Sequence, residues 1–123
     1  MTKIKVAVIG SNSFSGSDFI DLLLELKRYD VIGISRSQEK SALFLPYKRH
    51  NSADFRFYQF DLNRDMPQII NLLDSFAPEY VVNFAAQSEV APSWKNPGQW
   101  FMTNAVALTE LAHALNERKY MQR

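Results

Sequence analysis

The chain alternates between short apolar runs and segments with apolar residues at helical spacing. The runs are rich in β-branched and aromatic residues and predict buried strands at residues 5–10, 31–34, 55–60 and 80–86. Apolar positions recur every three or four residues over 17–28, 67–76 and 98–119, which predicts helices there. Residues 35–54 are polar and irregular, so we expect a loop with room for one helical turn.

Charged residues and prolines mark the ends of the predicted helices. Asp18 would lie in the first turn of the first helix, and Lys27 and Arg28 in its last turn, as the helix dipole favours. Pro67 suits the first turn of the second helix, and Pro78 would end it.

The alternation of strands and helices predicts the fold class. It favours a parallel sheet with right-handed crossovers. We expect an α/β fold with a Rossmann-like, doubly wound sheet of about four strands in the order 3-2-1-4. Residues 1–123 form one domain, long enough to bury about two thirds of the unfolded surface.

A glycine turn follows the first predicted strand. Gly10 can make the tight turn, and Gly16 allows the helix to lie close to the strand. Between them, Asn12 tolerates a positive φ, and hydroxyls are available to donate to phosphate from Ser11, Ser13 and Ser15. Such a turn before a helix N-terminus can bind a pyrophosphate. A tight turn without a ligand is the alternative.

The fourth predicted strand also ends in small and polar residues, at positions 85–88. In a doubly wound sheet it neighbours the first strand, and a dinucleotide binds in the crevice between their carboxyl ends. The two segments together therefore predict a nucleotide-cofactor site.

Composition excludes several other classes of protein. The net charge of +1 gives no indication of nucleic-acid or membrane-surface binding. No apolar run is long enough to cross a bilayer, and the start lacks the apolar core of a signal peptide, so a cytoplasmic protein is expected. There is no cysteine, and His50 and His113 are isolated, so no metal site is predicted.

These motifs resemble the N-terminal part of an extended short-chain dehydrogenase/reductase, in particular a nucleotide-sugar 4,6-dehydratase or epimerase acting on sugars of the GDP-mannose or dTDP-glucose type. That family writes the first turn as Gly-x-x-Gly-x-x-Gly. The other matching positions are Asp61-Leu62, residues 83–88 (Asn-Phe-Ala-Ala-Gln-Ser), Pro92, residues 101–104 (Phe-Met-Thr-Asn) and Thr109.

The resemblance implies roles for individual residues. The pyrophosphate would be held by Gly10, Asn12, Ser13, Phe14, Ser15 and Gly16. Asp61 and Leu62 would contact the adenine. Phe84, Ala85 and Ala86 would lie along the nicotinamide ribose, and Thr103 would approach the cofactor from the last helix. Ser88, with Gln87 beside it, would border a nucleotide-sugar substrate. Alternatively, Asp61 caps a helix, Thr103 is a polar position on a packed helix, and the two alanines are small only for packing.

Three departures from the family pattern matter. Ser13 replaces the middle glycine, which would cost about 1–2 kcal/mol if that position needs a positive φ. Glu89 stands where the family usually has His. The family's catalytic Tyr-x-x-x-Lys follows a fifth strand, and the chain ends before it, so we nominate no catalytic residue.

We therefore expect the cofactor-binding portion of a longer enzyme, truncated before strand five and without a substrate domain, which would not turn over alone. The resemblance also implies a homodimer formed through the last helix and the next one. The alternative is a non-catalytic NADP-binding sensor or assembly module. The bare edge of the apolar fourth strand argues against that alternative, because unpaired backbone groups invite pairing with another chain.

The end of the second strand bears on the choice of dinucleotide. An acid there would bind the ribose hydroxyls of NAD, whereas an arginine accommodates the 2′-phosphate of NADP. Arg36 stands at this end between two serines, and the first acid, Glu39, comes later. The sequence therefore favours NADP over NAD, with a surface arginine in a loop as the alternative.

Overall fold

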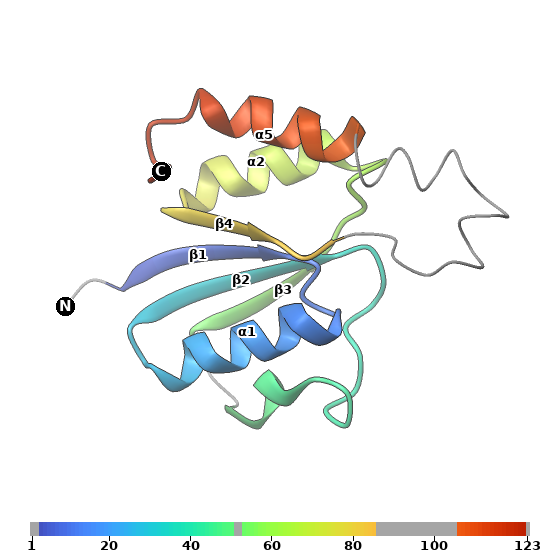
Figure 1. Ribbon diagram of the computed structural model, residues 1–123, viewed down its shortest axis with the longest axis vertical. Helices are drawn as coiled ribbons and strands as arrows, with labels where there is room; N and C mark the ends of the chain where they lie inside the picture. Colours follow the sequence, from blue (N-terminus) through green and yellow to red (C-terminus); the bar gives the residue numbers. More distant parts are fainter. Residues whose placement is uncertain (1–2, 51–52, 86–105, 123) are drawn as a thin grey trace, which may run out of the picture.

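A parallel sheet forms the centre of the protein. The computed structural model describes residues 3–50, 53–85 and 106–122. Within these ranges the sheet has four strands in the order β3-β2-β1-β4, which confirms the predicted α/β, Rossmann-like fold (Figure 1). The elements in chain order are β1 (Ile4–Ile9), α1 (Phe14–Glu25), β2 (Tyr29–Ser35), the 3-10 helix η1 (Pro46–His50), β3 (Phe55–Gln59), α2 (Met66–Phe76), β4 (Tyr80–Asn83) and α5 (Leu108–Asn116).

The first strand lies in the middle of this sheet. Residues 4–9 of β1 pair with residues 29–34 of β2, and residues 6–9 pair with residues 80–83 of β4 on the other side, all in parallel. The carboxyl ends of the strands therefore meet at one edge, on the right in Figure 1. The glycine turn and the end of β4 are neighbours there.

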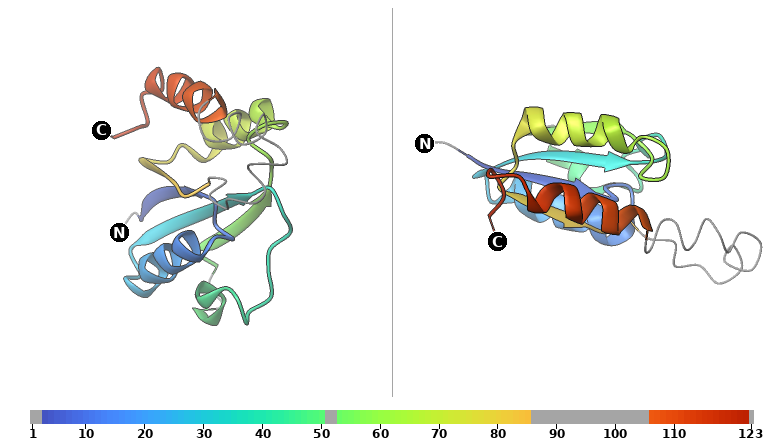
Figure 2. Two further views of the ribbon diagram at one scale, coloured as in Figure 1. Left: turned by 45° about the vertical axis from the view of Figure 1, so that its right-hand side comes forward. Right: turned by 90° about the horizontal axis from the view of Figure 1, so that it is seen from above.

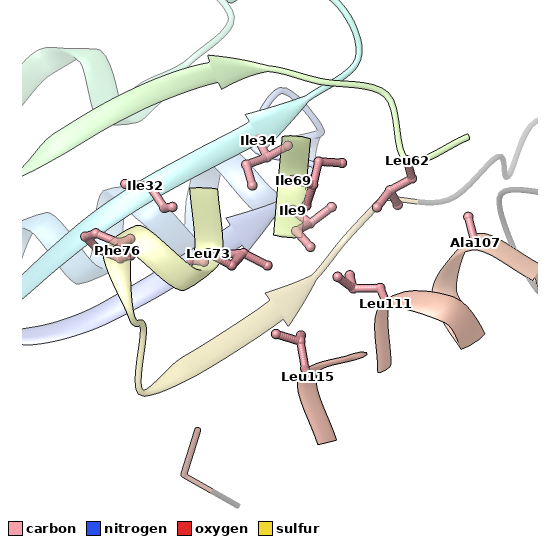
Figure 3. Close-up of a cluster of buried hydrophobic side chains, with 11 residues drawn as sticks. Ile9, Ile32, Ile34, Leu62, Ile69, Leu73, Phe76, Ala107, Leu111 and Leu115 are labelled. Carbon is pink, nitrogen blue, oxygen red and sulfur yellow. The ribbon is translucent and has the colours of Figure 1, made fainter. Parts of the chain in front are cut away.

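Helices cover both faces of the sheet. α2 and α5 lie on one face, and α1 and η1 lie on the other (Figures 1 and 2). Successive strand side chains point to opposite faces. Ile9, Ile32 and Ile34 accordingly pack with Leu73 of α2 and Leu111 of α5 in one cluster (Figure 3). The second cluster, on the α1 face, includes Val6, Val8, Val31, Ile20 and Leu23.

The first helix begins three residues earlier than predicted. α1 starts at Phe14 because Ser13, the residue before it, accepts a hydrogen bond from the N–H of Gly16 and so caps the helix. It ends at Glu25, and Lys27 follows in the left-handed region at φ 58°. The prediction that charged residues in the end turns of this helix match its dipole was therefore wrong. The first turn of α1 has no acidic residue, and the last turn has no basic residue.

The remaining boundaries differ at the ends of elements. α2 begins at Met66 and ends where Ala77 turns left-handed (φ 53°), one residue before Pro78. β4 ends at Asn83, short of the predicted end at residue 86, which lies outside the described residues. α5 ends at Asn116 instead of residue 119, and the predicted helical residues 98–105 lie outside the described ranges. The helical turn allowed for in the loop is η1.

An ion-pair cluster fastens η1 to α1. The carboxylate of Asp21 accepts hydrogen bonds from Arg49 Nε at 2.9 Å and Arg49 Nη2 at 3.2 Å, and His50 Nε2 lies 2.8 Å from its Oδ1. Burial alone would raise the pKa of Asp21, but the hydrogen bonds from Arg49 and His50 outweigh burial and lower it.

This lowered pKa predicts a pH-dependent contribution to stability. A carboxyl group whose pKa is lower in the folded state stabilises the fold above its unfolded pKa of about 3.9, and this contribution is lost as the pH falls through the folded value. We expect Asp21→Asn to lower the urea midpoint modestly at pH 7 and to match the parent chain at pH 2. Asp18→Asn, at an exposed position of the same helix, is the control. A difference that persists unchanged at pH 2 would contradict the assignment.

Candidate functional site

A pocket of about 300 Å³ opens at the carboxyl ends of the strands. The predicted site residues that line it are Gly10, Asn12, Ser13, Arg36, Asp61, Leu62, Phe84 and Ala85. Ser35 and Ser37, the two serines beside Arg36, also line it, as do Ile9, Ile34, Lys40 and Phe60, which were not predicted as site residues. The structure thus brings the ends of β1, β2, β3 and β4 around one cavity.

The two glycines of the turn have no room for a side chain. Gly10 has φ 88°, and a Cβ there would lie 2.6 Å from the backbone N of Ala85 and 2.7 Å from the carbonyl carbon of Phe84. A Cβ at Gly16 would lie 2.2 Å from the carbonyl oxygen of Gly10. Gly10 therefore makes the tight turn and Gly16 permits the close approach of α1, for the reasons expected from the sequence.

Ser13 is unstrained, contrary to the concern raised by its replacement of a glycine. Its backbone is extended, with φ −72° and ψ 161°. Its hydroxyl donates to the carbonyl oxygen of Gly10 at 2.7 Å and accepts from the N–H of Gly16 at 2.9 Å. The hydroxyl proton is therefore used inside the turn. Phe14 and Ser15 are exposed on the first turn of α1 and do not line the pocket.

Asn12 serves as a hydrogen-bond donor to residues 37 and 38, and not as a residue with a positive φ. The described non-glycine residues with a positive φ are Lys27 and Ala77, so Asn12 does not use its tolerance for that region. Instead its Nδ2 donates to the carbonyl of Gln38 at 2.8 Å, and to the Oγ and carbonyl oxygen of Ser37 at 3.0 and 3.3 Å. The carbonyl acceptors fix the orientation of this amide.

One atom of this amide remains unsatisfied. Asn12 is 7% exposed, and its Oδ1 is buried without a hydrogen-bond partner in the part of the chain that the structure describes. Buried acceptors of this kind normally have a donor, from protein, water or ligand. The Oδ1 of Asn12 therefore lacks the donor that such a buried acceptor normally has among the described residues.

Two cations line the pocket beyond the end of β2. Arg36 and Lys40 are exposed, and neither side chain makes an ion pair with another described residue. Glu39 lies between them in sequence but does not line the pocket. Its carboxylate instead accepts a hydrogen bond from the hydroxyl of Tyr47 at 2.6 Å and pairs with Lys48 at 3.3 Å. Burial and then this hydrogen bond raise the pKa of Tyr47, so the tyrosine remains a hydrogen-bond donor at neutral pH.

Asp61 lines the pocket and also stabilises a turn. Its Oδ1 accepts from the N–H of Asn63 at 2.8 Å, and its carbonyl accepts from Asp65 N at 2.7 Å. Asp65, rather than Asp61, is the residue before α2, and it makes no side-chain cap. Leu62 is 7% exposed and belongs to the core cluster of α2 and α5. The turn keeps both residues at the mouth of the pocket.

The end of β4 forms the opposite wall. The N–H of Phe84 donates to the carbonyl of Ile9 at 2.7 Å, and the N–H of Ala85 donates to Asn83 Oδ1 at 2.9 Å. The ring of Phe84 packs against Phe19 with centroids 5.6 Å apart. The remaining predicted residues lie outside the described ranges, namely Ala86, Gln87, Ser88 and Thr103.

The described residues contain neither a metal-binding cluster nor a membrane-spanning helix. No group of three or more His, Asp or Glu side chains within residues 3–50, 53–85 and 106–122 could hold a metal ion. Over the same ranges, no helix is long and apolar enough to cross a membrane.

Comparison with known proteins decides the family. Residues 8–122 match the family model described as GDP-mannose 4,6 dehydratase. The chain belongs to this dehydratase family. A curated relative, the UDP-glucose 4-epimerase of Mycoplasma pneumoniae, is 30% identical over 116 residues, which are 94% of this chain and 33% of the relative. The chain thus spans about a third of that protein, and the resemblance predicted from the sequence is confirmed.

Solved structures from the wider family share the fold. The UDP-glucose 4-epimerase of Thermotoga maritima, determined with UDP-glucose, has a TM-score of 0.75 at 25% identity and matches 95% of this chain and 35% of its own. The dTDP-glucose 4,6-dehydratase of Bacillus anthracis, determined with NAD, also has a TM-score of 0.75. At 15% identity, with 97% of this chain and 36% of its own covered, that likeness concerns the fold alone.

Proposed function

We propose that this chain is the N-terminal, cofactor-binding portion of an NAD(P)-dependent nucleotide-sugar 4,6-dehydratase or epimerase. The observation that carries the proposal is the contact between Gly10 and Ala85 at the pocket, where the backbones are too close for a Cβ. Such a bare backbone wall at the point where strand order reverses is what a dinucleotide requires. Membership of the dehydratase family supports the same conclusion.

In this proposal the pyrophosphate lies over the turn from Gly10 to Gly16, at the N-terminus of α1. Asp61 and Leu62 contact the adenine at the mouth of the pocket. The nicotinamide side of the cofactor is bound by Phe84 and Ala85, together with three residues outside the described ranges, Ala86, Gln87 and Thr103. Ser88 borders the sugar.

The cofactor, when bound, supplies hydride acceptance from C4 of the sugar. The residues of this chain bind and orient it. The family's Tyr-x-x-x-Lys pair does not occur in residues 1–123, so we propose that a further part of a longer protein supplies the base and the substrate domain. Nucleotide sugars are the proposed substrates because the epimerase of Thermotoga maritima was determined with UDP-glucose. We also propose a homodimer formed through the last helix and the next one, which a longer protein would supply.

The choice of NADP over NAD is the testable part of this proposal. We expect Arg36→Met to raise the dissociation constant for NADP about tenfold, because a charge-assisted contact to phosphate is lost, and to change that for NAD less than twofold. Calorimetric titration of the chain with each dinucleotide measures both constants. Arg28→Met is the matched control, since Arg28 precedes β2 at the amino ends of the strands, away from the pocket at their carboxyl ends. Equal losses for the two dinucleotides would contradict the NADP preference.

A further inference from the structure

The segment from Arg36 to Lys40 is held in place at every residue between the two cations. Asn12 Nδ2 donates to Ser37 and Gln38. Tyr47 donates to Glu39 from its hydroxyl, as described above. On the far side, Lys48 Nζ lies 3.3 Å from Glu39 Oε1 and donates to the carbonyl oxygen of Lys40 at 3.3 Å. The backbone of this segment, which we call the cation loop (residues 36–40), is therefore fixed from both ends.

The contacts also separate the charges of the cation loop. Glu39 is the acidic residue of the cation loop. Its carboxylate contacts Tyr47 and Lys48, and Glu39 does not line the pocket. Arg36 and Lys40, which flank it in sequence, both line the pocket. An acid in contact with Lys40 would neutralise it, so withdrawing Glu39 leaves two positive side chains facing the same cavity.

We infer that Lys40 is a second specificity-determining cation, which binds the 2′-phosphate of NADP together with Arg36. The inference rests on the function proposed above and adds a residue that sequence reasoning missed. A phosphomonoester carries nearly two negative charges at neutral pH, so one guanidinium leaves it incompletely neutralised. Arg36 offers a planar fork to two oxygens, and the ammonium of Lys40 supplies a compact charge on a flexible stem.

Tyr47 acts on this site as a positioning residue. It is 2% exposed, and its ring packs on Phe55 with centroids 4.4 Å apart, so only its hydroxyl reaches the cation loop. Without that hydroxyl, the contact of Glu39 with Lys48 would remain, and the carboxylate would be less firmly kept from Arg36 and Lys40. The expected consequence is weaker binding of NADP with little change for NAD.

The experiment is a titration of the chain and its variants with NADP and with NAD. We expect Lys40→Met to weaken NADP binding about five- to tenfold and NAD binding less than twofold. Lys40→Arg should restore most of the NADP affinity, because it keeps the charge. Lys119→Met, at an exposed position in the segment after α5, is the control and should change neither constant. The salt dependence of NADP binding should also decrease in Lys40→Met.

A second pair of variants tests the positioning role. Tyr47→Phe should weaken NADP binding about threefold, and adding Glu39→Gln to it should restore the affinity, because the released side chain then carries no charge. A purely structural effect of losing the hydroxyl would not be rescued by Glu39→Gln and would affect both dinucleotides alike.

The outcomes separate the two proposals. If the parent chain binds neither dinucleotide, the proposed function fails and this inference fails with it. If the parent chain binds but Lys40→Met leaves the ratio of NADP to NAD affinity unchanged, the role of Lys40 is wrong while the cofactor-binding function stands.

Discussion

Gly10→Ala is expected to destabilise the chain by about 2–6 kcal/mol and to abolish dinucleotide binding. An alanine held at φ 88° costs about 1–3 kcal/mol by itself. Its Cβ would also lie 2.6 Å from the backbone N of Ala85, so the end of β4 must shift, and overpacking of this kind costs about 1–3 kcal/mol more. Chemical denaturation measures the first effect and calorimetric titration with NADP the second.

The control for this variant is Ser15→Ala in the same turn. Ser15 is exposed at the start of α1, and its side chain makes no hydrogen bond to another described residue. The free energy of unfolding should change by less than about 0.5 kcal/mol. If Gly10→Ala unfolded with the same midpoint as the parent chain, the close approach of the β1 and β4 backbones would be disproved.

Leu73→Ala is expected to cost about 2–5 kcal/mol of the free energy of unfolding. Leu73 of α2 is completely buried among residues of β1, β2, α2 and α5, as Figure 3 shows. Truncation removes its transfer free energy and leaves a cavity between the helices and the sheet. Domains of this size are stable by about 5–15 kcal/mol, so the loss is a large part of the total.

The same substitution at an exposed leucine separates burial from chemistry. Leu43 in the loop after β2 is 91% exposed, and Leu43→Ala should change the free energy of unfolding by less than about 0.5 kcal/mol. Denaturant titration of the two variants under one set of conditions makes the comparison. Similar losses at Leu43 and Leu73 would contradict the layer arrangement described here.

The fold was predictable because its strands are short runs rich in β-branched and aromatic residues and its helices have apolar residues at regular spacing. Burial on both faces makes a parallel strand such as Val31–Ile34 apolar at every position except its glycine, and this pattern is visible without a structure. The ends of helices were less predictable. α1 begins at Phe14 because a single hydroxyl, that of Ser13, caps it, and apolar periodicity does not report a cap.

The site was predictable where the backbone determines it and less so where loops do. The roles of Gly10 and Gly16 follow from their place between a strand and a helix. Asn12 was predicted for its tolerance of a positive φ, which it does not use. Its hydrogen bonds to residues 37 and 38 were not predictable, because they join segments far apart in sequence. Lys40 was missed for the same reason. Hydrogen bonds from Asn12, Tyr47 and Lys48, which are distant in sequence, hold the segment of Lys40 at the pocket.

The central place of β1 affects how the chain can acquire its structure during synthesis. β1, α1 and β2 are adjacent in sequence and can pair as soon as the ribosome has released them. The other side of β1 must wait for Tyr80–Asn83, because β4 is the last of the described strands to be made. Until then β1, which is apolar at every position except Lys5, has one unpaired side, so the nascent chain is exposed to aggregation while residues 36–79 are translated.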